Sequence, residues 1–112
     1  MPAPITDPTA IEVALQRRLM DRERDNLGMP YHLPPVVCAD GFKVSLQASC
    51  FHYCLPRQDV GPWDAVELGF PSAPMPSLTQ YAEEPEDHTE TVFGYVPLTA
   101  VAQVLAEHGG LV

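Results

Sequence analysis

Two cysteines and a histidine stand close together in the middle of the chain, at Cys50, His52 and Cys54. Thiolate and imidazole groups are common zinc ligands, so this segment is a candidate metal site. On an extended strand the first and last of these side chains would lie about 13 Å apart, because each residue advances the strand by about 3.3 Å. One tetrahedral ion cannot span that distance, and closure would need a tight turn and a fourth ligand such as Cys38 or His32. We therefore predict buried, unreactive cysteines, a packed His52, and no metal or other cofactor.

The same segment also suggests a cysteine nucleophile. Cys54 lies near His52 in the sequence, and Asp59 could orient the imidazole as a base. Proximity in sequence is weak evidence for such a site, because catalytic triads are defined by geometry in space. The chain also contains no glycine-rich phosphate loop, no nucleophile elbow and no paired-histidine metal helix. We therefore predict a protein that is not an enzyme.

Arg57 is one of only two basic residues after position 40. If it is exposed, an ion pair with Asp59, Asp64 or Glu67 would contribute only about 0 to 1 kcal/mol. Its neighbours Tyr53 and Trp63 suggest another role, because arginine, tyrosine and tryptophan are enriched at binding hot spots. We therefore predict that Tyr53, Arg57 and Trp63 contact a partner.

Five carboxylates gather in one short segment, at Glu83, Glu84, Glu86, Asp87 and Glu90. Such a cluster is commonly a solvated loop, but it can also dock onto the basic surface of another protein. Its spacing does not reproduce the alternating ligands of a calcium loop. The whole chain carries a net charge of −9, which should repel nucleic-acid backbones and anionic membranes. The charge therefore predicts a basic protein partner, with no direct nucleic-acid binding and no membrane association.

The length of 112 residues fits a single core, since domains usually form over about 100 to 150 residues. The 13 prolines are about twice the usual share and should divide the chain into short elements. No apolar stretch approaches the roughly 18 to 20 residues of a membrane span. An odd number of cysteines and the lack of a secretory signal pattern indicate a reducing cytoplasm.

The N-terminal part should contain one amphipathic helix. Asp7 followed by Pro8 is a typical helix start, and apolar residues then recur every fourth position, at Ile11, Leu15 and Leu19. These patterns predict a helix from Pro8 to Asn26, followed by an extended proline-rich linker over residues 28–41. We therefore expect residues 1–41 to form the helix and linker and residues 42–112 to form the core domain. The two parts should make one structural unit.

The core domain should consist of a small sheet and a helix. Strict alternation predicts strands over residues 42–48 and 63–70, antiparallel to each other because the connection is short. Residues 50–55 should continue the first strand after a bend or begin its hairpin partner. A further strand is expected over residues 91–96, a short one near 78–81, and a helix over 98–108 that ends at Gly109 with positive φ. We therefore predict an α+β fold, in which a small antiparallel sheet carries the C-terminal helix on one face.

Several short strings after position 41 carry a resemblance: Val44-Ser45-Leu46-Gln47-Ala48, His52-Tyr53-Cys54, Pro56-Arg57, Gly61-Pro62-Trp63, Val66-Glu67-Leu68-Gly69-Phe70-Pro71-Ser72, Tyr81-Ala82-Glu83, Gly94-Tyr95-Val96-Pro97 and His108-Gly109-Gly110. With them the chain resembles small hypothetical proteins encoded by bacteriophages and prophages. The resemblance covers about two thirds of the chain, excludes residues 1–40 and brings no established activity. It implies an accessory protein in the cytoplasm of a bacterial host.

Three functions remain open at this point. In the first, the protein binds and blocks a host or defence-system protein through its acidic surface, as anti-CRISPR inhibitors do; this rests on analogy. In the second, it captures a small ligand or nucleotide signal with Arg57 and aromatic side chains, in a site between the subunits of a homodimer. The third is a minor hydrolase or zinc-dependent factor. We favour the first, because the chain offers a charged surface and aromatic anchors rather than a catalytic set.

Overall fold

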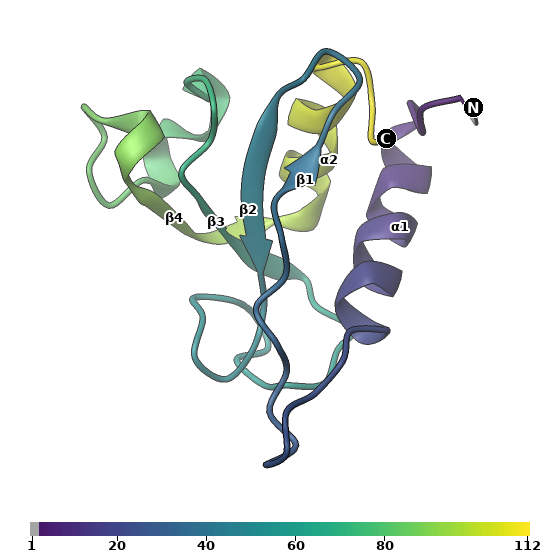
Figure 1. Ribbon diagram of the computed structural model, residues 1–112. Helices are drawn as coiled ribbons and strands as arrows, with labels where there is room; N and C mark the ends of the chain where they lie inside the picture. Colours follow the sequence, from purple (N-terminus) through teal and green to yellow (C-terminus); the bar gives the residue numbers. More distant parts are fainter. Residues whose placement is uncertain (1–2) are drawn as a thin grey trace.

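The computed structural model describes residues 3–112, in which one helix from each end of the chain accompanies a four-stranded sheet (Figure 1). The strands pair antiparallel in the order β1-β2-β3-β4. Helix α2 packs on one face of the sheet, with α1 beside it. This arrangement confirms the predicted α+β fold. The elements are α1 (Pro8–Met20), β1 (Val36–Val37), β2 (Lys43–Gln47), β3 (Ala65–Gly69), β4 (Val92–Pro97) and α2 (Leu98–Glu107), with the short 3-10 helices η1 (Pro76–Tyr81) and η2 (His88–Glu90) between β3 and β4.

Helix α1 begins where the sequence predicts, because the Asp7 carboxylate accepts a hydrogen bond of 2.9 Å from the backbone N–H of Ala10. Its predicted end at Asn26 is wrong, since the helix stops at Met20. The next residues form a turn around Asp25, whose carboxylate accepts hydrogen bonds from two backbone N–H groups further along the chain. Aspartate favours such turns over helix, and this one competes with the last predicted helical turn.

The apolar stripe of α1 packs within the chain rather than against a partner. Ile11, Leu15 and Leu19 are at most 1% exposed and belong to the same hydrophobic core as the sheet and α2. Residues 1–41 and 42–112 therefore share one core in the described part of the chain.

Three of the predicted elements differ from the structure. Residues 28–41 are not only a linker, because Val36 and Val37 form β1 and pair with β2. Residues 50–53 are turns and bends rather than strand, and only Leu55 in this segment forms an isolated antiparallel bridge, to Ala65. The predicted short strand near 78–81 is part of η1, which starts at Pro76, a residue suited to the first position of a helix.

Gln47 shows why the linker follows the sheet closely. Its amide nitrogen donates a hydrogen bond of 2.8 Å to the carbonyl of Leu33, and its amide oxygen accepts one of 3.1 Å from the Leu33 N–H. This paired contact makes Gln47 only 2% exposed, although its polar side chain alternates with the apolar side chains of β2. A buried amide that is satisfied in this way holds one backbone against another.

The end of α2 follows the prediction closely. Gly109 has a φ of +88° and Gly110 one of +93°, a conformation that glycine adopts without strain. A side chain at Gly110 would place its Cβ 2.3 Å from the carbonyl oxygen of Ile5. Ile5 and Leu111 also exchange two backbone hydrogen bonds of 2.9 Å, so the two ends of the described chain are tied together.

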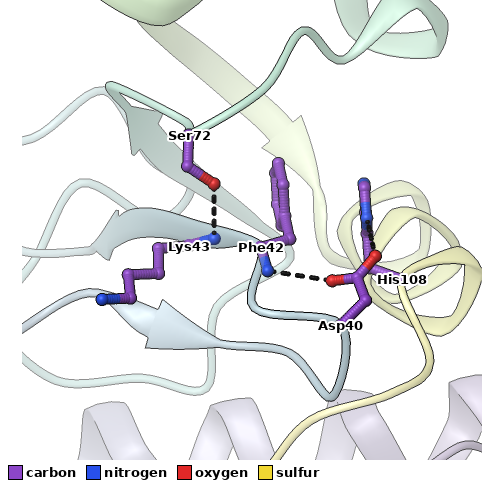
Figure 2. A network of polar contacts seen from close by, with 5 residues as sticks. All are labelled: Asp40, Phe42, Lys43, Ser72 and His108. Atoms are coloured by element: carbon purple, nitrogen blue, oxygen red, sulfur yellow. Dashed lines mark hydrogen bonds and ion pairs between the residues drawn. The ribbon is translucent and has the colours of Figure 1, made fainter.

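A polar network joins this helix end to the turn between β1 and β2 (Figure 2). The Asp40 carboxylate accepts a hydrogen bond of 2.9 Å from the N–H of Phe42 and lies 2.7 Å from Nδ1 of His108. The imidazole stacks on Phe42, with ring centroids 3.9 Å apart. The hydroxyl of Ser72 accepts a hydrogen bond of 2.9 Å from the N–H of Lys43. In residues 3–112 no hydrogen bond joins Ser72 to His108. The three residue types of a serine triad are therefore close together without forming a triad.

The Asp40 contact predicts a pH-dependent contribution to stability. The hydrogen bond from Phe42 N–H and then the His108 imidazole hold the pKa of Asp40 below its ordinary value. A lowered carboxyl pKa stabilises the fold above about pH 4, and this stabilisation is lost as the pH falls through the folded-state pKa. Asp40→Asn should therefore melt below the wild type at about pH 6, and the difference between the two melting temperatures should shrink as the pH falls through the folded-state pKa of Asp40. Equal melting temperatures at about pH 6 would contradict this role.

Candidate partner-binding groove

A bulge in β4 turns one tyrosine toward the surface. Leu68 pairs with Phe93 and Val66 pairs with Val96, so β4 carries one more residue than β3 between these two pairs. The extra length falls at Gly94 and Tyr95. Tyr95 has a φ of +55° and is 44% exposed. A left-handed conformation is uncommon outside glycine, and bulges often redirect a side chain near a functional site.

Tyr53 is held beside Tyr95 through its backbone. Its N–H donates a hydrogen bond of 3.2 Å to the Glu67 carboxylate, and its carbonyl accepts one of 2.9 Å from the N–H of Tyr95. A Cβ at Gly94 would lie 3.1 Å from Cβ of Tyr53, so this side chain packs directly on the glycine. The two tyrosine rings are tilted by 41° with centroids 5.8 Å apart.

The segment after η1 closes a groove of about 420 Å³ beside these rings. The N–H of Glu83 donates 3.0 Å to the carbonyl of Val92, and Ala82 bridges to Phe93, so this segment runs along β4. We call this groove the tyrosine groove. It combines three phenol rings, one carboxylate and one amide, and its lining is Tyr53, Gln80, Tyr81, Ala82, Glu83, Gly94 and Tyr95.

Arg57 lies next to the tyrosine groove. Its guanidinium carbon is 5.4 Å from the centre of the Tyr53 ring, within the range of a cation–π contact. Its Nε donates 3.1 Å to the carbonyl of Cys50. The structure thus brings together two of the predicted partner-binding residues, Tyr53 and Arg57.

The prediction that Trp63 contacts a partner is wrong for this conformation, because its side chain is only 1% exposed. The indole N–H donates 3.2 Å to the carbonyl of Gln58, and the Arg22 guanidinium lies 5.2 Å from the ring centre. Gly61 leaves the ring the space it needs, since a Cβ there would be 2.4 Å from it. Trp63 is therefore a core residue that organises the loop before β3.

The predicted acidic residues are all exposed, and Glu83 is the one that lines the tyrosine groove. Two hydrogen bonds hold the segment that carries them: the N–H of Glu84 donates one of 3.0 Å to the Thr91 hydroxyl, and Nδ1 of His88 accepts one of 3.0 Å from the backbone N–H of Met75. In residues 3–112 none of the five carboxylates forms an ion pair or a hydrogen bond. We call Glu83, Glu84, Glu86, Asp87 and Glu90 the acidic loop.

The cysteine segment has a different character. Cys54 is fully buried, its thiol donates 3.2 Å to the carbonyl of Ser49, and burial raises its pKa, which disfavours a thiolate nucleophile. Burial likewise raises the pKa of Cys38 to about 11, whereas Cys50 is half-buried. Burial lowers the pKa of His52, whose Nδ1 lies 2.6 Å from the Ser49 hydroxyl. Over residues 3–112 no three histidine, cysteine or acidic side chains are grouped as a metal would require.

Sequence reasoning missed Tyr81, Tyr95 and Gln80 as groove residues. One signal for Tyr95 was present, because a glycine inside a strand pattern often marks a bulge, and Gly94 stands inside the predicted strand. Nothing comparable marks Tyr81, since its place depends on the 3-10 helix that the sequence did not predict.

The conformation of Tyr95 can be tested by comparing two variants that both remove the ring. Tyr95→Gly should be about 1 kcal/mol more stable than Tyr95→Ala, because only glycine adopts a left-handed φ without a steric cost. Urea unfolding of both proteins measures the difference. The same pair at Tyr31, an exposed tyrosine with no positive φ, is the control and should not favour glycine. Equal stability of the two Tyr95 variants would rule out the strained bulge.

None of the helices in the described residues is long and apolar enough to cross a bilayer. Comparisons of the chain with protein-family models, with curated proteins and with solved structures found no match in any of the three.

Proposed function

We propose that this chain is a binding protein, and that the tyrosine groove and the acidic loop engage a basic surface of another protein. The observation that carries the proposal is the meeting of three tyrosine rings with Glu83 at the edge of a loop of unpaired carboxylates. Tyrosine is a common anchor at interfaces, because its rigid ring offers a large apolar area together with a polar tip. Complementary charge around such an anchor steers a partner toward it.

The net charge of −9 supports a basic partner. The resemblance to phage-encoded proteins makes a bacterial host or defence protein the expected partner, which the bound chain would block. Capture of a nucleotide or other polyanion is less favoured, because Glu83 lines the groove and the Glu67 carboxylate accepts a hydrogen bond from Tyr53 N–H, so that the positive charge of Arg57 is outweighed by two carboxylates.

Affinity capture from a bacterial lysate with matched baits tests this function. The wild-type chain should retain a defined basic protein or complex, and the double variant Tyr53→Ala/Tyr95→Gly should lose it. Tyr31→Ala, which removes an exposed tyrosine outside the groove, should retain it. Circular dichroism of each bait confirms folding beforehand. A capture pattern that is the same for all three baits would refute the proposal.

A further inference from the structure

The chemistry of the tyrosine groove is suited to a particular kind of side chain. Tyrosine rings attract cations through their negatively charged faces, and this attraction grows when the cation loses water. Tyr53 and Tyr95 are 39% and 44% exposed and stand at 41° to each other, so two non-parallel rings border the groove. Tyr81 lines the same space. A cation in the groove would therefore meet several rings at once.

Polar groups at the edge of the groove add direction to this attraction. Glu83 supplies a carboxylate that is exposed and takes part in no ion pair of the described chain, and Gln80 supplies an amide oxygen that can accept a hydrogen bond. A planar guanidinium can stack on an aromatic ring and direct its N–H groups toward acceptors at the same time, whereas an ammonium acts as a compact point charge. The mixture of rings and acceptors therefore favours arginine over lysine.

The chain itself contains an example of the contact. The Arg57 guanidinium already lies 5.4 Å from the Tyr53 ring centre, with its Nε bonded to the Cys50 carbonyl. Arg57 adds one positive charge beside the groove, but Glu67 and Glu83 add two negative ones. The local charge therefore still favours a second guanidinium.

From these observations we infer that the tyrosine groove binds an arginine side chain of the partner protein, stacked on Tyr53 and Tyr95 and paired with Glu83. The inference rests on the proposed function and names the chemistry of the partner at this site. In the complex, the acidic loop would contact further basic residues around the arginine.

Titration of the isotope-labelled chain with N-acetyl-arginine methylamide tests the inference, because this probe carries the side chain without a partner protein. In NMR spectra, the backbone amide signals of Tyr53, Glu83, Gly94 and Tyr95 should shift with the probe concentration until they saturate. The citrulline analogue has nearly the same shape without the charge, and it should bind at least about five-fold more weakly. The lysine analogue should also bind more weakly than arginine.

Variants of the chain locate the effect. Tyr95→Gly and Glu83→Gln should each weaken the binding of the arginine probe by at least about two-fold. Tyr31→Ala should not change it. Equal shifts with citrulline, a preference for lysine, or shifts centred outside the groove would overturn the inference. The titration uses the chain alone, so a negative result would leave the outcome of the affinity capture, and with it the broader binding function, unaffected.

Discussion

Replacing Trp63 with alanine should lower the free energy of unfolding by about 3 to 5 kcal/mol, the usual cost of deleting a large buried aromatic side chain. Trp63 is 1% exposed, and its loss would leave a cavity beneath the loop before β3. It would also remove the hydrogen bond to Gln58 and the ring beneath the Arg22 guanidinium. The cavity would also disturb the charged Arg22 guanidinium beside it. Its Nε is buried and has no hydrogen-bond partner in the described chain.

Chemical denaturation of the purified Trp63→Ala protein measures this loss. Tyr53→Ala is the matched control, since it removes an aromatic side chain that is 39% exposed, and it should cost much less. If Trp63→Ala unfolds like the wild type and instead weakens a partner complex, Trp63 is a surface anchor and its buried position in the fold is wrong.

Neutralising the acidic loop should slow association with the captured partner about ten-fold or more at low salt, because clustered charge raises the rate of encounter. The variant carries Glu83→Gln, Glu84→Gln, Glu86→Gln, Asp87→Asn and Glu90→Gln. Its fold should be unchanged, since exposed substitutions usually shift stability by less than about 0.5 kcal/mol each. Its association rate should also depend less on salt than that of the wild type.

The control for this experiment neutralises five carboxylates elsewhere, at Glu12, Asp21, Glu23, Asp64 and Glu107, and so has the same net charge. If the position of the charge matters, this control should associate faster than the loop variant. Tyr95→Gly provides the contrast, because loss of an anchor should mainly speed dissociation. Association rates that are the same for the loop variant and the wild type would show that the acidic loop only solvates the surface.

The regular elements of the fold could be predicted where local pattern and burial agree. Strict alternation marked β2 and β3, and a glycine stop marked the end of α2, because these signals arise within a few residues. The errors arise where side-chain hydrogen bonds or distant contacts decide the structure. The Asp25 turn ended α1 early, and pairing with β2 made a strand of Val36 and Val37 in a proline-rich segment. Gln47 is buried for the same reason, through its contact with Leu33.

The binding residues could be predicted only in part. Tyr53 lies in the tyrosine groove, Arg57 lies beside it, and the acidic residues form the loop that borders it. These residues could be predicted because residue type is a fair guide to which side chains are exposed and charged. Trp63 illustrates the limit, since the same residue type anchors interfaces and fills cores, and only burial separates the two roles. Tyr81 and Tyr95 were missed because a 3-10 helix and a bulge bring them to the groove.

Site-specific photo-cross-linking in the presence of the captured partner shows whether the partner binds at the tyrosine groove. A photoreactive phenylalanine analogue at Tyr95 lies in the tyrosine groove, and the same analogue at Leu27, which is 86% exposed and outside the groove, is the control. We expect a cross-link from position 95 to an arginine-containing basic segment of the partner, reduced when the acidic loop is neutralised, and little or none from position 27. Cross-linking from position 27 alone, or equally from both positions, would contradict it.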